Sequence, residues 1–564
     1  MLDKKFITTQ YEQLHELICE HSLENELGSK LEQLKTIIDT FSLKLLTIGA
    51  FSAGKSALLN HLIQEDLLVE EQTPETAIAT ELKYSPIEHY EIVDLKNEAI
   101  SVEKNQLKTA NPETTLNLRY ALNNPFLRRF DDYTLVDMPG FNSNIEQHNK
   151  AILQYIGQGN AYLLVLDCED GGIKASVREF MDEIRQYQHN LIIVISKSDK
   201  KTPSQIEKIK QNVMDQAGYL FNAEVPVVTF SKYDEMAREN LADSISQINV
   251  QSIFEQATIP LVKELYSYVQ IAINQSLKSV SLDNKEIQEE IYKRQKAKAD
   301  LEHKLKAERS KLTHRMNNQV LPGIIGAVES VLFANSTELA NAAISGQHAF
   351  SSRVNSLLRP VLLENTKRYT EESYAEFLRE INLESILSDK TDEIVQGVTD
   401  KIRQLTSLIE KADKTGDAFN KSYKAITGVL AIATTAVAPW LEIIILFLPE
   451  ILKLFGVGGR DSQVEKLRSS IENEVIPQII SKLRPAIQES LIEVENQLLQ
   501  DIEDSICLAI SIEEDALAKA RDTQQQADEE HSSIVKNYEE KLKIIADHLQ
   551  AVGQVAGGSV HANF

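Results

Sequence analysis

The segment Gly49-Ala-Phe-Ser-Ala-Gly-Lys-Ser56 matches the phosphate-binding pattern Gly-x4-Gly-Lys-Ser/Thr. An apolar run at 43–48 precedes it and a helical pattern at 57–63 follows it, which is the strand–loop–helix setting that this motif needs. Glycine lets backbone N–H groups approach phosphate oxygens at a helix N-terminus, where the helix dipole favours anions. The segment therefore predicts a P-loop nucleotide-binding domain.

The residue types in the loop indicate how it would hold a nucleotide. We expect Lys55 to reach the β- and γ-phosphates and the Ser56 hydroxyl to bind Mg²⁺. The other residues that we expect around the phosphates are Gly49, Ser52, Ala53, Gly54 and Ala57.

A second segment, Tyr133-Thr-Leu-Val-Asp-Met-Pro-Gly140, is a predicted strand that ends in Asp-x-Pro-Gly. We expect Asp137 to hold the water shell of Mg²⁺ and the Gly140 N–H to sense the γ-phosphate.

A third segment, Leu191-Ile-Ile-Val-Ile-Ser-Lys-Ser-Asp199, predicts a buried parallel strand that ends in Ser-Lys-Ser-Asp. This ending resembles the Asn/Thr-Lys-x-Asp guanine signature of GTPases. Asp199 can accept both the ring and the exocyclic N–H of guanine, which adenine cannot supply. Lys197 would lie along the base. Together with Ser231-Lys232, which resembles the last base-contacting GTPase motif, the segment favours GTP over ATP.

The first position of the guanine motif is Ser196 instead of Asn or Thr. The longer side chain normally braces this loop against the P-loop, so one interpretation is a weaker affinity for the base. The alternative, which we favour, is that the short hydroxyl is harmless.

The composition places the chain among multidomain proteins of a reducing compartment. Its 564 residues exceed one hydrophobic core, and its 3 cysteines have no metal-binding spacing. The net charge of −25, without a basic stripe, argues against a nucleic-acid partner. The N-terminal residues lack the apolar core of a signal peptide, so we expect a cytoplasmic protein.

Strand-like runs alternate with helical patterns between about residues 42 and 240, which predicts a doubly wound α/β domain with a mostly parallel sheet. The rest of the chain has helical patterns. Residues 3–38 read as helix up to the start of the α/β domain, and 461–552 contains no glycine. We therefore expect an elongated all-α bundle built from the N-terminal, middle and C-terminal segments.

An apolar stretch at 425–455 stands out in the helical part, and Pro439 divides it into two arms. Each arm is shorter than the roughly 20 apolar residues of a membrane-spanning helix. The only tryptophan, Trp440, lies beside the break with Leu441, and tryptophan favours a membrane interface. One interpretation is a hydrophobic hairpin that enters one leaflet; the other is a helix pair buried in the bundle or in a dimer interface.

With these features the chain resembles the dynamin superfamily of large GTPases, and among its members the bacterial dynamin-like proteins, with the LeoA type nearest. The residues that carry the resemblance are the P-loop at 49–56, Pro74-Glu-Thr-Ala77, the Asp-x-Pro-Gly at 137–140 and the helices with an apolar tip. The resemblance implies neck and trunk helices with a membrane-binding paddle. The domains would be N-terminal neck helices at 1–41, a GTPase domain at 42–240, neck and trunk helices at 241–420, the hairpin at 421–460 and returning helices at 461–564.

The resemblance also implies catalytic roles. Ser52 would help to organise the attacking water and a monovalent cation, and Thr76 would bind Mg²⁺ and position that water, with Thr73 and Thr80 as alternatives. Phe141 replaces the catalytic glutamine of small GTPases, which dynamin-like proteins also lack; in the family, loop backbone and a dimer partner supply that geometry. The acidic, glycine-free residues 69–72 depart from many members, so hydrolysis is expected to be slow or to need a partner protein.

The predicted function is a peripherally membrane-associated GTPase that binds GTP, GDP and Mg²⁺. It would dimerise through its GTPase domains, bind or remodel membrane lipid, and work with a companion dynamin-like protein. The alternative is a soluble GTP-binding switch or scaffold that hydrolyses little and uses the apolar hairpin to bind a protein partner.

Overall fold

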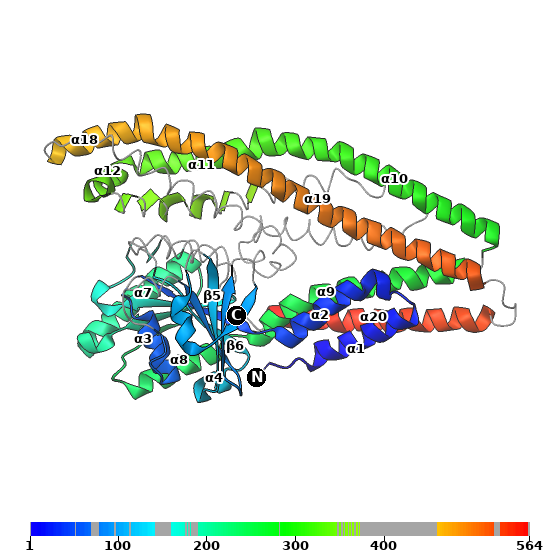
Figure 1. Cartoon of the computed structure of the whole chain (residues 1–564), viewed down its shortest axis with the longest axis horizontal. Helices are drawn as coiled ribbons and strands as arrows, with labels where there is room; N and C mark the ends of the chain where they lie inside the picture. The colour runs from blue at the N-terminus through cyan, green and yellow to red at the C-terminus, as the bar shows by residue number, and fades with distance from the viewer. Residues whose placement is uncertain are drawn as a thin grey trace.

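The computed structural model describes residues 2–50, 52–68, 78–94, 98–111, 114–140, 159–174, 190–280, 282–346, 460–523 and 531–561, and parts of 177–181 and 349–372. It consists of a sheet domain and a set of long helices beside it (Figure 1). The predicted hairpin at 421–460, with Pro439, Trp440 and Leu441, lies outside the described residues except for its last residue.

The sheet has nine strands in the order β4-β3-β5-β2-β6-β1-β7-β8-β9. Strand β1 pairs in parallel with β6 and β7, and the parallel pairing continues through β8 to β9. Strand β2 is antiparallel to β6 but parallel to β5, and β3 is antiparallel to both β4 and β5. This mostly parallel sheet confirms the predicted fold class. The strands are β1 Leu43–Gly49, β2 Ala79–Tyr84, β3 His89–Asp94, β4 Ala99–Val102, β5 Thr115–Leu122, β6 Tyr133–Asp137, β7 Ala161–Asp167, β8 Leu191–Ser196 and β9 Val227–Thr229.

Each face of the sheet has its own apolar core, because successive side chains of a strand point to opposite faces. On one face, Leu45 packs in a cluster with residues of α3 (Lys55–Ile63), α4 (Pro125–Arg129) and α8 (Glu235–Ser246). On the other face, Leu46 packs in a cluster with residues of α7 (Pro203–Phe221). The described part of the domain also contains the short 3₁₀ helices η2 (Lys104–Thr109), η4 (Cys168–Asp170) and η5 (Ser198–Lys200).

Four helices from both ends and the middle of the chain form a bundle next to the sheet domain: α1 (Lys5–Glu20), α2 (Glu24–Thr40), α9 (Val250–Ser279) and α20 (His531–His561) (Figure 1). We call it the neck. The Tyr266 hydroxyl donates to Gln10 Oε1 at 3.0 Å, and Lys30 Nζ lies 3.0 Å from Glu264 Oε1. The residues 3–38, which read as helix in the sequence, form two helices, because the chain turns at residues 21–23, where Ser22 has φ +53°.

A second group of helices within the described ranges forms an arm that we call the trunk: α10 (Asn284–Arg315), α11 (Leu321–Ala334), α12 (Ser336–Ser345), α18 (Arg460–Ser470) and α19 (Ile476–Thr523). Single π-helical turns, η6 (Met316–Val320) and η7 (Ile471–Val475), interrupt the two sides of the trunk. In Figure 1, α10 and α19 turn back at the far end of the neck and run toward the sheet-domain end of the molecule, where α18 lies.

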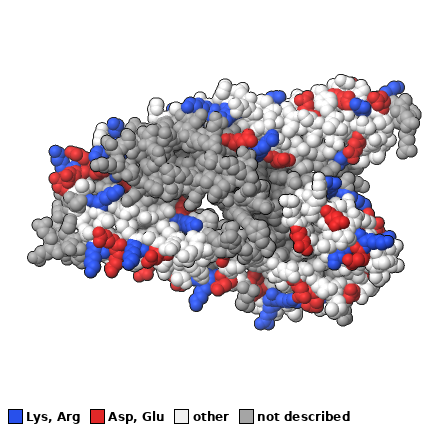
Figure 2. Space-filling model, turned by 180° about the vertical axis from the view of Figure 1, so that it is seen from behind, with Lys and Arg blue, Asp and Glu red and all other residues white. Residues whose placement is uncertain are grey.

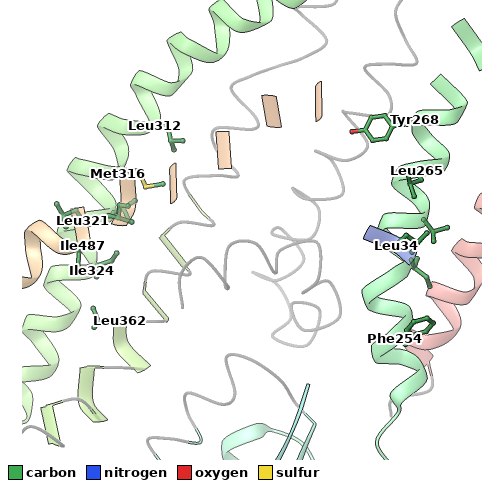
Figure 3. Packing of buried hydrophobic residues seen from close by; sticks show 14 of the residues in the cluster. Leu34, Phe254, Leu265, Tyr268, Leu312, Met316, Leu321, Ile324, Leu362 and Ile487 are labelled. Atoms are coloured by element: carbon green, nitrogen blue, oxygen red, sulfur yellow. The ribbon is translucent and has the colours of Figure 1, made fainter. Parts of the chain in front are cut away.

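A large apolar cluster fills the helical part of the molecule (Figure 3). In the trunk, Leu312 and Ile324 belong to it together with Ile487 of α19, and in the neck Leu34 and Phe254 do. Each of these side chains except Leu312, which is 1% exposed, is fully buried. Burial of this kind, and not helix propensity, stabilises long helices.

A buried ionic cluster joins neck and trunk. The Arg294 guanidinium donates to Glu513 Oε2 of α19 and to Glu290 Oε2 of α10, each at 2.7 Å, and to Gln275 Oε1 of α9 at 3.4 Å. Burial raises the pKa of Glu513, although Arg294 opposes that rise. Removing one partner of a buried ion pair leaves an uncompensated charge, so this cluster ties three helices together where the trunk turns back.

None of the helices in the described ranges is by itself long and apolar enough to cross a membrane. The bent pair Arg309–Ala334 and Ser336–Ser345, with 66° between its parts, meets the length and composition criteria. Within this pair Ile324, Val328 and Leu332 are fully buried in the trunk core. Figure 2 shows lysine, arginine and acidic side chains interspersed over the described part of one molecular face.

Candidate nucleotide-binding site

The P-loop connects β1 to α3 at the carboxyl edge of the sheet. A Cβ atom at Gly49 would lie 2.5 Å from the carbonyl oxygen of Val165, so no side chain fits there. Gly54, immediately before α3, has φ +92°, which other residues rarely adopt. Ser52 is also left-handed, with φ +62°, and its side chain is exposed. The backbone thus curls into a concave loop at the N-terminus of α3, which suits an anion.

Lys55 lies at the centre of this loop and is only 8% exposed. Its ammonium donates to the carbonyl oxygens of Gly49 and Ala50, each at 3.3 Å. Burial lowers the pKa of Lys55 to about 8, and the negative charge of Asp137 opposes this shift. A phosphate group in the loop would supply the anionic partner that favours the charged ammonium.

Ser56 and Asp137 come together beside the loop. The Ser56 hydroxyl donates to Asp137 Oδ2 at 2.7 Å, while Asp137 Oδ1 is buried with no hydrogen-bond partner. Burial raises the pKa of Asp137 to about 6, against the effects of Ser56 and Lys55. A hydroxyl and a carboxylate with an unpaired oxygen suit a hydrated Mg²⁺, which prefers oxygen ligands and keeps several waters. The residues present therefore fit the predicted metal.

The other predicted residues near the γ-phosphate divide into two groups. Gly140 is buried and follows β6 by three residues, at the same edge as Asp137. Thr80 is buried in β2, directly opposite Asp137 in the antiparallel register with β6. Thr73 and Thr76 lie outside the described residues, so the choice of the switch threonine stays open.

Residues 196–200, which we call the base loop, begin at the last residue of β8 and contain the predicted guanine motif. Its first residue, Ser196, contacts the P-loop directly. Its hydroxyl lies 2.6 Å from the carbonyl oxygen of Ala53 and 3.1 Å from that of Leu166, and the residue is 3% exposed. The short side chain therefore keeps the brace between the base loop and the P-loop that a longer residue normally provides. This contact favours the interpretation that the short hydroxyl is harmless, and the effect of Ser196 on the affinity for the base stays a prediction.

Lys197 makes a second bridge to the P-loop. Its ammonium donates to the Ser52 carbonyl oxygen at 2.8 Å and to Asp167 Oδ2 at 2.6 Å. Burial alone would raise the pKa of Asp167, but the hydrogen bond from Lys197 holds it below its ordinary value. Beneath this pair, Cys168 Sγ lies 3.0 Å from the Lys197 carbonyl oxygen. Asp167 was not among the predicted site residues; its one signal is its place at the end of the apolar run 161–166.

Asp199 lies in the base loop, on η5, and is exposed. The Ser231 hydroxyl donates to Asp199 Oδ1 at 2.7 Å and so fixes the orientation of the carboxylate. Lys232 is exposed, with its ammonium 5.4 Å from the centre of the Tyr233 ring. The fixed carboxylate matches the two adjacent N–H donors of a guanine base.

The carboxyl ends of β1, β6, β8 and β9 meet at one edge of the sheet, where open α/β domains bind their ligands. The predicted residues that the structure places at this edge are Gly49, Ser52, Ala53, Gly54, Lys55, Ser56, Ala57, Asp137, Gly140, Lys197, Asp199, Ser231 and Lys232.

The sheet domain is also the part of the chain that matches a known protein family. Residues 45–198 match the sequence model of the Dynamin family. An uncharacterized Caldicellulosiruptor protein encoded in the xynA 3' region is 27% identical over 213 residues, which are 36% of this chain and 50% of that protein. Dynamin-like protein 2 of Campylobacter jejuni is 23% identical over 249 residues, 42% of this chain and 39% of the relative. The chain thus spans about half, or less, of the length of these relatives.

Among solved structures, one of an oligomerised bacterial dynamin pair aligns with 95% of this chain and 92% of its own, at 15% sequence identity and a TM-score of 0.33. This value is too low to establish a common arrangement of the domains.

Proposed function

We propose that this chain is a bacterial dynamin-like GTPase that binds and hydrolyses GTP, a proposal supported by the match of residues 45–198 to the sequence model of the Dynamin family. We further propose that the GTPase domains associate in the GTP state and that the helices bind or remodel membrane. One observation carries the GTPase proposal: the Ser56–Asp137 pair, with its unpaired buried oxygen, lies beside the charged Lys55 and near a guanine-type loop braced through Ser196. Assignment to the LeoA type stays a prediction.

In the proposed mechanism the protein supplies position and charge, with little covalent chemistry. Lys55 and the loop N–H groups would hold the β- and γ-phosphates, and Asp199 would select guanine. Ser56 and Asp137 would hold Mg²⁺, which when bound neutralises charge that develops on the phosphates. Ser52 and Thr76 remain the proposed residues for placing the attacking water, with a monovalent cation near Ser52.

The membrane part of the proposal rests on the position of the trunk end. Helix α18 begins at Arg460, where the predicted hairpin ends, and lies at the end of the arm (Figure 1). We propose that the hairpin extends from this end of the arm and contacts a lipid surface. The alternative scaffold function would use the same hairpin to bind a protein, and a companion dynamin-like protein would be one such partner.

Co-sedimentation with liposomes tests the membrane proposal. We expect the protein to sediment with vesicles of mixed neutral and anionic lipid, and the double variant Trp440→Asp, Leu441→Asp to stay in the supernatant. A charge at membrane depth costs about 2.5–3.5 kcal/mol. Because Trp440 is the only tryptophan, vesicles should also shift its emission to shorter wavelength.

The binding of a GTP analogue serves as the control, because it should be equal in both proteins. If the wild-type protein ignores vesicles and its tryptophan emission is unchanged by them, the scaffold function replaces the membrane function. The GTPase proposal would be unaffected by that result.

The affinity for a non-hydrolysable Mg–GTP analogue should be highest between about pH 6 and 8. Below this window Asp137 is protonated in the free protein and must lose its proton when a cation binds, so affinity falls as the pH falls. Above it Lys55 is increasingly neutral and must gain a proton to meet the phosphates, so affinity falls as the pH rises. Fluorescence titration with a labelled nucleotide across the pH range measures both limbs.

The γ-phosphate of the nucleotide also titrates near the acid limb of this profile. The variant Asp137→Asn distinguishes the titration of Asp137 from that of the phosphate. The variant should keep the alkaline limb and lose part of the acid limb. An unchanged acid limb would show that Asp137 does not titrate on binding.

A further inference from the structure

Asn60 is a buried polar residue on α3, one helical turn after Ser56, and only 4% of it is exposed. Its side-chain oxygen accepts hydrogen bonds from the Leu67 N–H at 3.1 Å and the Leu68 N–H at 2.8 Å. Its side-chain nitrogen donates to the Leu68 carbonyl oxygen at 2.8 Å. A single amide thus binds both backbone groups of Leu68.

These bonds fold the chain back against the helix that carries the P-loop lysine and serine. Helix α3 ends at Ile63, and Gln64 turns the chain with φ +56°. Asn124 supports this turn by donating to the Ile63 carbonyl oxygen at 2.8 Å. Leu68 is then buried in the same core cluster as α3.

The anchored residues lie immediately before the segment with two of the candidate switch threonines, Thr73 and Thr76. After that segment, strand β2 pairs with β6, where Thr80 faces Asp137. The residue before this segment, Leu68, is hydrogen-bonded to α3, the helix that carries Ser56. The strand after the segment, β2, pairs with β6, the strand that carries Asp137. Ser56 and Asp137, two of the predicted Mg²⁺ residues, therefore lie on the helix and the strand that hold the two ends of this segment.

We propose that Asn60 is a positioning residue for GTP hydrolysis, which fixes the start of the switch segment relative to the phosphate and Mg²⁺ site. This inference rests on the proposed GTPase function. Without the amide, the backbone N–H groups of Leu67 and Leu68 lose their hydrogen-bond partner. Because an unsatisfied buried donor is unfavourable, we expect this part of the chain to move toward water. A displacement of about 1 Å in a reacting group can lower a rate by about a hundredfold. Asn60 is not among the residues that we expect to contact the nucleotide.

The test compares Asn60→Leu, which keeps the volume and removes the hydrogen bonds, with the wild-type protein. We expect kcat in single-turnover GTP hydrolysis to fall by about ten- to a hundredfold, while the Kd for labelled GDP stays unchanged. Hydrogen–deuterium exchange should show loss of protection at the amides of Leu67 and Leu68. Asn60→Asp keeps the acceptor for both N–H groups and should give an intermediate kcat; it also serves if Asn60→Leu does not fold.

The matched control is Leu59→Ala, which removes a fully buried neighbour on the same helix and lowers stability without removing a hydrogen bond to the segment. Its kcat should remain close to that of the wild type. Equal kcat losses in Leu59→Ala and Asn60→Leu, or a normal kcat in Asn60→Leu, would overturn the positioning role. Absence of hydrolysis in the wild-type protein would instead overturn the proposed GTPase function, and the exchange measurement would still decide whether Asn60 holds the segment.

Discussion

Replacing Lys55 with alanine should remove most of the affinity for GTP. A hydrogen bond to a charged group contributes about 1.5–3 kcal/mol, which corresponds to roughly a ten- to hundredfold change in Kd. Lys55 is buried, and its ammonium lies within the loop against the Gly49 carbonyl oxygen. We therefore expect that no exposed cation can take over its contact with the phosphates. Calorimetric titration with a GTP analogue measures the loss directly.

The same substitution should not destabilise the nucleotide-free protein. Burial lowers the pKa of Lys55 to about 8, which means that the folded state disfavours its charge. Lys200→Ala is the matched control, because Lys200 is an exposed lysine of the base loop that pairs with Glu169. If Lys55→Ala binds the analogue as well as Lys200→Ala does, Lys55 is not the phosphate-binding lysine.

The sheet domain was largely predictable because its central strands are buried on both faces. The apolar runs that became β7 and β8 are continuous, which is typical of parallel strands in the middle of a sheet. The half of the sheet with β2 to β5 was not predictable in its order. Its edge strands are partly exposed and mix polar with apolar residues, so their pattern does not say which strand pairs with which.

The helical part shows the same limit in another form. The helical pattern of residues 3–38 was correct, but the break at residues 21–23 contains neither glycine nor proline. Tertiary contacts mark it instead: the Lys519 ammonium donates to the carbonyl oxygens of His21 at 3.0 Å and Ser22 at 2.9 Å. Sequence periodicity within one helix carries no information about a partner some five hundred residues away.

The motif residues of the nucleotide site could be named from the sequence, because each motif is a short pattern of neighbouring residues. The residues that hold the motif residues in place could not be named, because they act through contacts between separate parts of the chain. Asp167 supports Lys197 only because β7 and β8 are adjacent and in register, and Asn60 holds Leu68 only because the chain turns back after α3. The role of Ser196 likewise depends on the distance to Ala53, which the residue type alone does not give.

Asp199→Asn should change the base preference of the protein from guanine to xanthine. The carboxylate can accept from two donors of guanine at once, and an amide at this position keeps one acceptor and presents one donor. The donor would face the exocyclic N–H₂ of guanine, so two donors would meet and the contact would become unfavourable, whereas xanthine has a carbonyl oxygen there. Sites built around such hydrogen bonds discriminate by up to about 10⁴–10⁵, so we expect a loss of GDP affinity of two orders of magnitude or more.

A neighbouring hydrogen bond in the structure indicates which atom of the introduced amide would face the base. The Ser231 hydroxyl donates to Asp199 Oδ1 at 2.7 Å, and a donor at that place selects the amide oxygen, which leaves the amide nitrogen toward the base. Ser231→Ala added to Asp199→Asn should therefore reduce the gain in affinity for xanthosine diphosphate. Asp234→Asn, an acid-to-amide change at the N-cap of α8, should leave the base preference unchanged. If Asp199→Asn keeps the preference of the wild-type protein for guanosine diphosphate over xanthosine diphosphate, Asp199 does not contact the base.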